Sequence, residues 1–380
     1  MIEVPFIDLY SQYLLAKRDI DDALSGVIKK SLFVGGDVVE NFERDFAKYI
    51  GVKFIISVNS GTDALILGMR GLDLPRNSEV MLPANTFFST ALAAISNNLT
   101  PVFVDIDEKD NGINLKDLEK KMSNKTKAII LVHMYGQSDK INEVKRIIKK
   151  TGREIHLVED ACQSHGSYYN DHKIGTYGVF SAFSFYPTKN LGGFGDGGAI
   201  ATNNKKLFQK YRLLRQYGSV KKYYHDEIGF NSRLDSLQAA VLSAKLNYLD
   251  SWNLKRQKAA YLYDKLLSGL SQYVITPTQF QTRKSVYYTY VIRAKNRDKL
   301  MLFLKSHGIN TVIHYPLPLH LQKAYAYLGY SKGDLPIVEK VSKEILSLPM
   351  FESISVKQIK YVANTIKQFY RNASPIRINQ

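Results

Sequence analysis

The sequence predicts an α/β protein of two domains, a large one built on a mostly parallel sheet and a smaller C-terminal α+β one. Three observations predict this fold class. The chain has 380 residues, which is too long for one small core. Short apolar runs alternate with helical patterns up to about residue 250, and such alternation builds a parallel sheet covered on both faces. From about residue 275 the pattern becomes a shorter mixture of both types. We therefore expect domains over residues 1–250 and 251–380.

The individual elements follow from hydrophobic periodicity and from Gly, Pro and small polar residues between the runs. Expected strands cover residues 54–58, 79–82, 101–105, 127–134, 155–159 and 180–186, with two more over 287–293 and 311–315 in the smaller domain. Expected helices cover residues 14–30, 37–50, 64–69, 91–96, 115–122, 141–150, 204–217, 238–249, 252–267, 298–305 and 340–345. Residues 8–13 are expected to be irregular, residues 221–230 a polar aromatic loop, and residues 372–380 a loose tail.

Composition indicates a cytoplasmic protein that does not span a membrane. The apolar fraction of 45% and the charged fraction of 23% are ordinary for a globular enzyme. No run approaches the ~20 apolar residues that a membrane span needs. The N-terminal stretch is acidic and interrupted by Pro5, which does not fit a signal peptide. Cys162 is the single cysteine, so no intramolecular disulfide forms, as expected for a reducing compartment.

The net charge of +17 is compatible with two interpretations. Lysines are scattered through the helical segments, which favours a basic solvated surface, while part of the charge could steer an anionic substrate toward a cleft. A nucleic-acid-binding protein would concentrate the charge beside a recognisable motif. Since neither end of the chain contains a separate helix-turn-helix segment, we expect no nucleic-acid partner.

A single lysine, Lys189, is the most informative residue of the chain. A strand pattern runs to Tyr186, Pro187 ends it, and a glycine-rich run from Gly192 to Gly198 follows the lysine. A lysine held at a rigid strand end can lose proton affinity and become a nucleophile for Schiff-base formation. The alternative is a solvated lysine beside a flexible turn.

Other polar and aromatic groups follow neighbouring strands, where the parallel sheet predicts a ligand site. Ser60, Gly61 and Thr62 stand between a strand and a helix, so backbone N–H groups there can bind an anion. Simple helix capping by Ser60 or Thr62 is the alternative. Asp160 ends an apolar strand, where a carboxylate is costly without a cationic partner.

Together these residues match what pyridoxal phosphate requires. Lys189 would bind its aldehyde, Ser60 to Thr62 with Ser184 its phosphate, and Asp160 its pyridine nitrogen, while Phe87 would cover the ring. No metal ligand set is expected.

Four ordered motifs carry a family resemblance over nearly the whole chain. They are NSGTDAL (59–65), DACQSHG (160–166), SFYPTKNLG with a following GDGGA (184–199), and NSRLDSLQAA (231–240). The chain resembles the DegT/StrS-type sugar aminotransferases. The resemblance implies the aspartate-aminotransferase fold (fold type I), pyridoxal phosphate on Lys189, and a homodimer with shared active sites. It implies that Asp160 and Gln163 hold the cofactor ring and that Asn231 reaches the phosphate of the neighbouring subunit's cofactor.

Within the family, the motif around Lys189 and two further segments (132–137 and 314–322) resemble enzymes that aminate C3 of a nucleotide-linked 3-keto sugar, with L-glutamate as donor. Tyr186, Arg233, His314 and His320 are candidate substrate contacts, although aromatic packing and an exposed loop explain Tyr186 and the histidines equally well. The alternatives are a UDP-linked 3-keto N-acetylated uronic acid or a 4-keto sugar as substrate, a pyridoxal-phosphate dehydratase or epimerase, and a basic regulatory protein that senses the cofactor.

Overall fold

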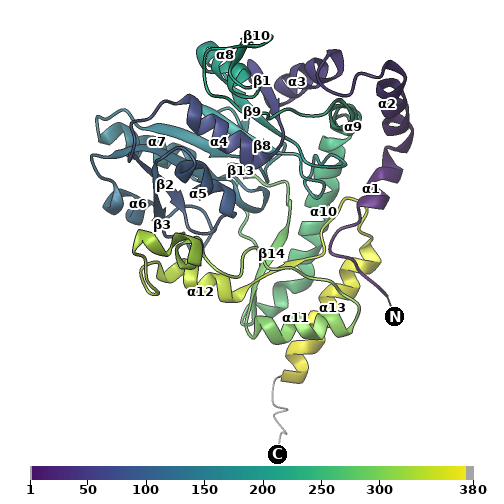
Figure 1. Cartoon of the computed structure of the whole chain (residues 1–380). Helices are drawn as coiled ribbons and strands as arrows, with labels where there is room; N and C mark the ends of the chain where they lie inside the picture. Colours follow the sequence, from purple (N-terminus) through teal and green to yellow (C-terminus); the bar gives the residue numbers. More distant parts are fainter. Residues whose placement is uncertain (1, 374–380) are drawn as a thin grey trace, which may run out of the picture.

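A seven-stranded sheet organises the larger part of the chain, as the computed structural model of residues 2–373 shows (Figure 1). Its strands are β1 (Phe54–Val58), β2 (Glu79–Pro83), β3 (Thr100–Val104), β4 (Thr126–Val132), β5 (His156–Asp160), β8 (Phe180–Ser184) and β9 (Gly198–Thr202). They lie in the order β1-β9-β8-β5-β4-β2-β3. β9 is antiparallel to both of its neighbours, and every other neighbouring pair is parallel. The prediction of a mostly parallel sheet is confirmed.

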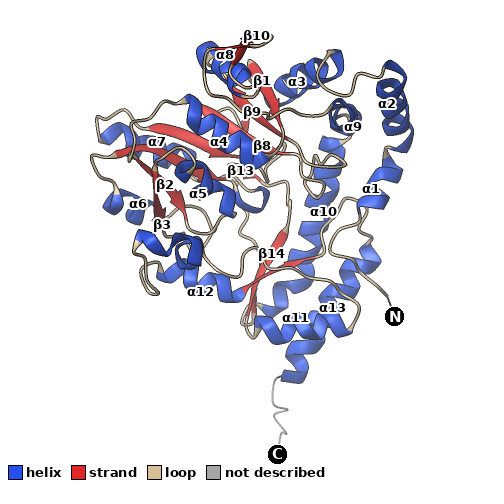
Figure 2. Ribbon diagram, in the orientation of Figure 1, coloured by secondary structure: helices blue, strands red, loops and turns tan. Residues whose placement is uncertain are grey.

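Helices cover both faces of this sheet (Figure 2). One face packs against α4 (Gly61–Gly71), α5 (Phe88–Ile95), α8 (Lys205–Leu214) and α12 (Pro336–Glu344). The other packs against α3 (Asp37–Ile50), α6 (Leu115–Lys121), α7 (Ile141–Lys150) and α9 (Ser236–Leu246). In α3, for example, Phe42, Phe46 and Ile50 recur every fourth residue and are all buried. Because both faces are covered, most strand residues are buried instead of alternating between buried and exposed.

A smaller antiparallel sheet forms the core of the C-terminal unit. Its strands, in the order β12-β14-β15, are β12 (Val274–Ile275), β14 (Tyr290–Ala294) and β15 (Ile345–Leu348). They pack against α10 (Leu249–Leu267), α11 (Arg297–Ser306) and α13 (Val356–Ala373). Val4 belongs to the same core and forms a β-bridge with Ile309, so the start of the chain packs on this unit. The domain boundary at residue 250 stays a prediction.

Short elements complete the description. They are the helices α1 (Leu9–Leu15) and α2 (Lys17–Lys30), the strand pairs β6 (Tyr168–Tyr169) with β7 (His172–Lys173) and β10 (Ser219–Lys221) with β11 (Tyr224–His225), the strand β13 (Arg283–Lys284) beside β6, and the 3-10 turns Met134–Gly136, Ser268–Leu270, Leu319–Leu321 and Lys323–Leu328.

Several predicted elements were wrong. Residues 9–15 are helical, not irregular, because the Asp8 carboxylate accepts a hydrogen bond from the Ser11 amide at 2.9 Å and caps α1. The predicted helix over residues 14–30 is broken at Ala16. Residues 311–315 form no strand; Val312 makes only an isolated bridge to Ser347.

Other elements were not predicted at all: β9, β12, β15, α13 and the hairpin of β10 and β11 inside the expected loop. Of the predicted tail, residues 374–380 lie outside the described residues, and residues 372–373 belong to α13.

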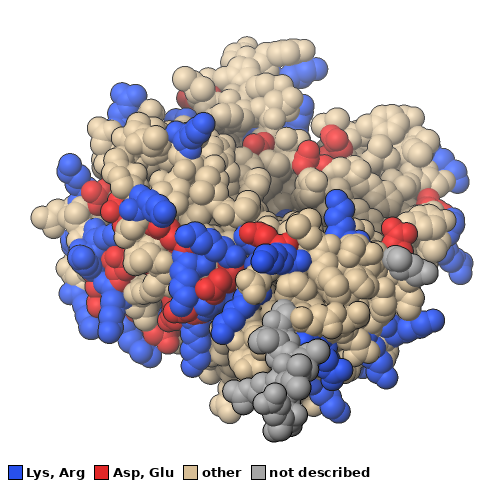
Figure 3. Space-filling model, turned by 90° about the horizontal axis from the view of Figure 1, so that it is seen from below, with Lys and Arg blue, Asp and Glu red and all other residues tan. Residues whose placement is uncertain are grey.

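Positive charge is concentrated in the C-terminal part of the chain. Residues 251–380 contain 20 Lys and Arg against 6 Asp and Glu, whereas residues 1–250 contain 32 against 29. Seen from below, blue side chains crowd one face of the molecule, with acidic ones among them (Figure 3). The charge excess therefore belongs mainly to residues 251–380. Within residues 2–373, no helix is long and apolar enough to cross a membrane.

Candidate active site

A cavity of about 600 Å³ lies at the carboxyl end of the parallel strands, between the large sheet and the C-terminal unit. This is the size of a small-molecule site. The residues that line it are Phe6, Ile7, Ser60, Gly61, Thr62, Leu65, Thr86, Phe87, Ser89, Val132, Asp160, Cys162, Gln163, Ser184, Tyr186, Thr188, Lys189, Asp196, Tyr288, Val312, His314, Tyr315 and Met350. Ten residues that the sequence singled out are among them.

Asp160 is held rigidly at the end of β5. Its register partners are Val132 on β4 and Ala182 on β8, which places it at the shared edge of the sheet. One carboxylate oxygen accepts a hydrogen bond from Thr90 Oγ1 at 2.8 Å, and the other accepts one from the Cys162 amide at 3.2 Å. Asp160 is buried, and a buried carboxylate with only neutral donors is suited to a cationic ligand group.

Lys189 lies in a tight turn just beyond β8. Its amide donates a hydrogen bond to the Tyr186 carbonyl at 2.9 Å, and its Nζ lies 4.1 Å from the centre of the Tyr288 ring. The Tyr288 hydroxyl is 3.2 Å from Thr188 Oγ1. The amine is therefore presented to the cavity against an aromatic face that stabilises its charged form.

The N-terminus of α4 forms a second polar part of the wall. Ser60 caps the helix by accepting a hydrogen bond from the Asp63 amide at 3.1 Å, and Thr62 Oγ1 is 2.7 Å from Ser89 Oγ. Gly61 is required by close packing, because a Cβ there would lie 2.6 Å from Ser184 Cβ. The first N–H groups of a helix have no partner within it, so this end can bind an anion.

Phe87 and Gln163 both contact Tyr315. The Phe87 and Tyr315 ring centres are 5.7 Å apart. Gln163 Nε2 donates to the Tyr315 hydroxyl at 3.4 Å, while Gln163 Oε1 accepts from the Tyr135 amide at 2.8 Å. The amide group of Gln163 is thus fixed in orientation by both of its ends, as a ligand-orienting residue should be.

The wall contributed by the C-terminal unit and the first residues of the chain is uncharged. Burial and the nearby Lys189 charge lower the pKa of His314 to about 4, so its ring is neutral at neutral pH. Its Nδ1 lies 2.9 Å from Ser347 Oγ, and its ring packs 5.8 Å from that of Phe6. Lys189 is the one cationic side chain among the lining residues.

The residues present fit pyridoxal phosphate. The polar groups of the cavity are the Lys189 amine, the buried Asp160 carboxylate and the N-terminus of α4 with the nearby hydroxyls of Ser60, Thr62 and Ser184. Close packing against Ser184 and Cys162 excludes a side chain at Gly61, so the backbone itself forms this part of the wall. An aldehyde, a pyridine nitrogen and a phosphate are the three groups that such a set can bind.

Three of the predicted site residues do not line this cavity. His320 is buried and its Nε2 lies 3.1 Å from Glu339 Oε1, so the predicted direct substrate contact does not fit its position. Asn231 and Arg233 lie on the loop after β11. Asn231 bridges Gln216 through its backbone, and the Arg233 guanidinium lies 5.9 Å from the Tyr217 ring.

Several cavity residues were not found from the sequence. Tyr288, Tyr315, Met350 and Phe6 have no glycine-rich turn beside them, and only the packing of the C-terminal unit brings them to the cavity. Thr90 was also missed. The sequence does show that Thr90 lies four residues after Thr86, a spacing that brings side chains together at the start of a helix. In the structure the two Oγ1 atoms are 2.8 Å apart.

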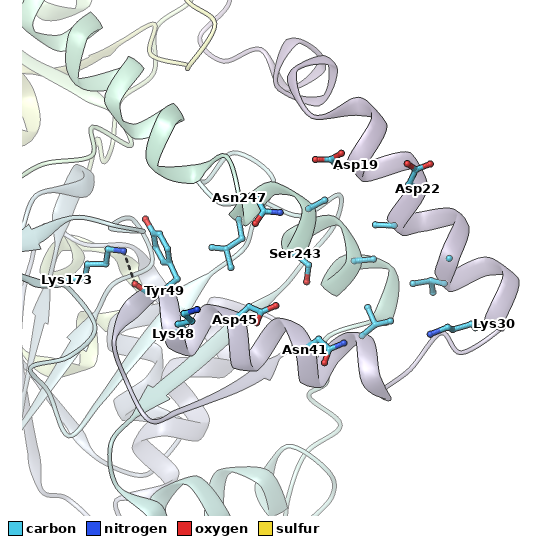
Figure 4. Close-up of a pocket in the computed structure, with 17 residues that line it drawn as sticks. Asp19, Asp22, Lys30, Asn41, Asp45, Lys48, Tyr49, Lys173, Ser243 and Asn247 are labelled. Atoms are coloured by element: carbon cyan, nitrogen blue, oxygen red, sulfur yellow. Dashed lines mark hydrogen bonds between the residues drawn. The ribbon is translucent and has the colours of Figure 1, made fainter.

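A second, larger hollow of about 960 Å³ lies between α2, α3 and α9 (Figure 4). Its charged residues are spread along the helices: Asp19 and Asp22 on α2, Asp45 and Lys48 on α3. Lys173 Nζ donates a hydrogen bond to the Tyr49 carbonyl at 2.8 Å. Since these groups do not converge on one point, the smaller cavity is the candidate active site.

Comparison with known proteins agrees with this assignment. A model of the DegT/DnrJ/EryC1/StrS aminotransferase family matches residues 15–367. The chain is 43% identical over 372 residues to the "Pleiotropic regulatory protein" of Geobacillus stearothermophilus, covering 98% of this chain and 100% of that one. It is 38% identical over 366 residues to the dTDP-3-amino-3,4,6-trideoxy-alpha-D-glucose transaminase of Streptomyces venezuelae, covering 96% of each.

The structure is similar to the X-ray structure of DesV from S. venezuelae in complex with a ketimine intermediate, with a TM-score of 0.94 and 37% identity over 97% of this chain and 99% of that one. The predicted fold is confirmed by this similarity.

Proposed function

The chain belongs to the DegT/DnrJ/EryC1/StrS aminotransferase family, and we propose that it uses pyridoxal phosphate to aminate C3 of a nucleotide-linked 3-keto hexose. The observation that carries this proposal is the convergence of Lys189, Asp160 and the N-terminus of α4 on one cavity. The transaminase of Streptomyces venezuelae, which matches over 96% of this chain, supports the choice of reaction and of the C3 position.

Pyridoxal phosphate, when bound, supplies an aldehyde that links to amines and a ring that withdraws electrons from them. In this proposal Asp160 holds a proton on the ring nitrogen, and Thr90 and the Cys162 amide hold Asp160. Ser60, Gly61, Thr62 and Ser184 bind the phosphate at the end of α4.

Lys189 binds the aldehyde and then moves a proton at its Nζ as general base and acid. The face of Tyr288, 4.1 Å from Nζ, stabilises the protonated amine between these steps. Phe87 covers the ring, and Gln163, which is hydrogen-bonded to Tyr315, orients it.

An uncharged 6-deoxy hexose fits the sugar end of the cavity best. Phe6, Tyr288, Tyr315 and Met350 present apolar and aromatic surface there, and His314 is neutral. Within a single chain, a uronic acid would bring a carboxylate to a wall that offers no cation besides Lys189, and an unpaired buried carboxylate is costly. Its binding would therefore depend on the Arg233 that a second chain contributes in the dimer proposed below. Tyr186, which is 52% exposed at the mouth of the cavity, is a candidate contact for the nucleotide part.

Amino transfer in separate half-reactions tests the function. The purified enzyme would be converted to its aminated form with L-glutamate, the proposed donor, and freed of excess donor. It would then be mixed with a dTDP-linked 3-keto-6-deoxy hexose, its 4-keto isomer, or a UDP-linked 3-keto N-acetylated uronic acid. We expect amino sugar, detected by mass spectrometry, from the first substrate alone. Product from the 4-keto or uronic substrate instead would overturn the substrate assignment, and no product from any would overturn the transaminase assignment.

We further propose a homodimer in which Asn231 and Arg233 serve the partner's cavity. Both lie outside the cavity of their own chain, on a loop that also carries Phe230 and Ile228, which at 92% is the most exposed large apolar side chain among the residues the structure describes. Exposed apolar side chains of this size are typical of subunit interfaces. The cytoplasm is the proposed location.

Mixing two inactive variants tests the shared site. One chain carries Lys189→Ala and the other Asn231→Asp, whose carboxylate would repel a phosphate. If Asn231 serves the partner, each heterodimer has one site with both residues intact. Half of the dimers formed at random are heterodimers, so about a quarter of the wild-type activity should return after co-refolding. No recovery in proven heterodimers would show that each chain builds its own site.

A further inference from the structure

A buried lysine outside the cavity connects three separate segments of the chain. Lys245 lies near the end of α9 and is only 2% exposed. Its Nζ donates hydrogen bonds to Gln12 Oε1 of α1 and to the Gly192 carbonyl, both at 2.8 Å. Gly192 follows Lys189 by three residues. The lysine therefore links α1 and α9 to the turn that contains the proposed catalytic amine.

That turn is closed on itself around Lys189. The Gly193 amide donates to the Phe185 carbonyl at 2.8 Å, and the Lys189 amide donates to the Tyr186 carbonyl. A Cβ on Gly192 would lie 2.3 Å from the Pro187 carbonyl oxygen, so the two ends of the turn touch and only glycine fits there. A change in the position of Gly192 would consequently move Lys189.

α9 contacts this turn at two points. Gln238 Oε1 accepts a hydrogen bond from the Phe194 amide at 2.7 Å, and Lys245 lies seven residues further on, on the same side of the helix. Lys245 Nζ also lies 4.7 Å from the centre of the Phe194 ring. Gly192 and Phe194, at the start of the glycine run, are thus both held by one helix. That helix directly follows the loop of Asn231 and Arg233.

Burying the Lys245 ammonium costs free energy, so packing alone does not explain a lysine at this position. Among residues 2–373 no carboxylate forms an ion pair with it. Burial lowers its pKa to about 8, with a smaller opposing effect of Glu352. A buried ammonium without a counter-ion costs stability, which an aliphatic side chain of similar length would not. What the ammonium provides is two directed hydrogen bonds, one of them to the turn.

We propose that Lys245 is a positioning residue that holds the turn of residues 190–195 and thereby fixes Lys189 in the cavity. Asn190 anchors the same turn from the other side, where its Nδ2 donates to Asn253 Oδ1 at 2.7 Å and to the Val286 carbonyl at 3.0 Å. The catalytic consequence rests on the proposed role of Lys189, whereas the order of the turn does not depend on it.

Hydrogen exchange and steady-state kinetics on the purified holoenzyme test the proposal. Lys245→Met removes both hydrogen bonds and keeps the length of the side chain. We expect amides of residues 189–195 to exchange about tenfold faster and kcat to fall about tenfold, because misplacing a catalytic group by a fraction of an ångström is costly. KM for donor and acceptor should change less than about twofold, since neither substrate contacts Lys245.

Two further variants complete the test. Lys245→Arg, which keeps the charge and the donors, should recover most of both losses, and Lys255→Met, which removes an exposed lysine of α10, should change neither. Should Lys245→Met not fold, Gln12→Leu removes one acceptor and leaves the charge. It should speed exchange in the turn by about threefold, as expected for one lost hydrogen bond.

The proposal would be overturned if the amides of residues 189–195 exchanged in Lys245→Met as slowly as in the wild type, whatever happens to kcat. If Lys245→Met does not fold, the same result in Gln12→Leu would overturn it. Faster exchange with unchanged kcat would also overturn it, because Lys245 would then order the turn without positioning Lys189. Hydrogen exchange is measured without any substrate. It therefore still tests whether Lys245 orders the turn, even if the transaminase assignment is wrong.

Discussion

The two walls of the cavity differ in chemistry. The large-domain wall (Ser60, Gly61, Thr62, Asp160, Ser184 and Lys189) carries the charged side chains and is fixed by the sheet and by hydrogen bonds. The small-domain wall (Phe6, Tyr288, His314, Tyr315 and Met350) is aromatic, apolar and neutral, and it comes from loops and from the start of the chain. The difference indicates that one wall performs the chemistry and the other selects the substrate.

This comparison predicts effects of different size and kind. Changes on the large-domain wall remove interactions with developing charge and should lower kcat by orders of magnitude. Changes on the small-domain wall remove contact surface and should act mainly on KM, by small factors.

Lys189→Ala should have the largest effect. Without Nζ no residue on the cavity wall can bind the aldehyde or move the proton, so amino transfer should fall by about four orders of magnitude or more. Circular dichroism should show an intact fold, because the side chain is not part of a core. Activity within tenfold of wild type would mean that the chemistry does not depend on this wall.

Asp160→Asn should lower kcat by about two to three orders of magnitude, because an amide cannot stabilise a protonated ring nitrogen as a carboxylate does. The matched control is Thr90→Val, which removes one hydrogen bond to Asp160 and should cost about tenfold. A loss of only a few-fold in Asp160→Asn would show that Asp160 merely stabilises the end of β5.

His314 should affect the pH dependence of stability. Its pKa is about 4 in the folded protein and 6.5 in the unfolded chain, so the unfolded chain binds more protons between these values. The free energy of unfolding therefore falls as pH decreases from 6.5 to 4. Replacing the ring by His314→Asn should reduce that loss by about 3 kcal/mol, measured by urea unfolding at pH 7 and pH 4.

The control is His172→Asn, which removes an exposed histidine and should leave the pH dependence as it is. An unchanged loss in His314→Asn would mean that the small-domain wall does not hold this ring neutral.

Tyr315→Phe should have the smallest effect. It removes one long hydrogen bond, from Gln163 Nε2 at 3.4 Å, and keeps the ring against Phe87. We expect KM for the nucleotide sugar to rise by about two- to fivefold with kcat nearly unchanged. Tyr327→Phe, on an exposed part of the surface, is the control. A hundredfold loss of kcat would place Tyr315 in the chemistry and remove the distinction between the walls.

The same two walls mark what the sequence could predict. Asp160, Phe87 and Ser60 to Thr62 each follow a strand, and strands of a parallel sheet end at one edge, so their meeting could be inferred. Pro187 before Lys189 and the glycines after it indicated that this lysine lies at a strand end beside a tight turn.

The small-domain wall could not be inferred in the same way. Tyr288 and Tyr315 are two of 25 tyrosines, and only the packing of β14, β15 and the first residues of the chain brings them to the cavity. The predicted strand over residues 311–315 failed for a related reason, since that segment bridges Ser347 at one point and otherwise lines the cavity. His320 lies in a proline-containing segment that looks like an exposed loop, but its ring is buried and contacts Glu339 in the interior.

The central claim is that Lys189 holds the cofactor, and chemical mapping tests it most directly. Holoenzyme would be reduced with borohydride, which makes the link between pyridoxal phosphate and its lysine permanent, then digested and analysed by mass spectrometry. Lys245 is the chemical rival, because it is buried and burial lowers its pKa to about 8. We predict the added mass on the peptide that contains Lys189 and on no other. The added mass on Lys245, or on no lysine at all, would contradict the account.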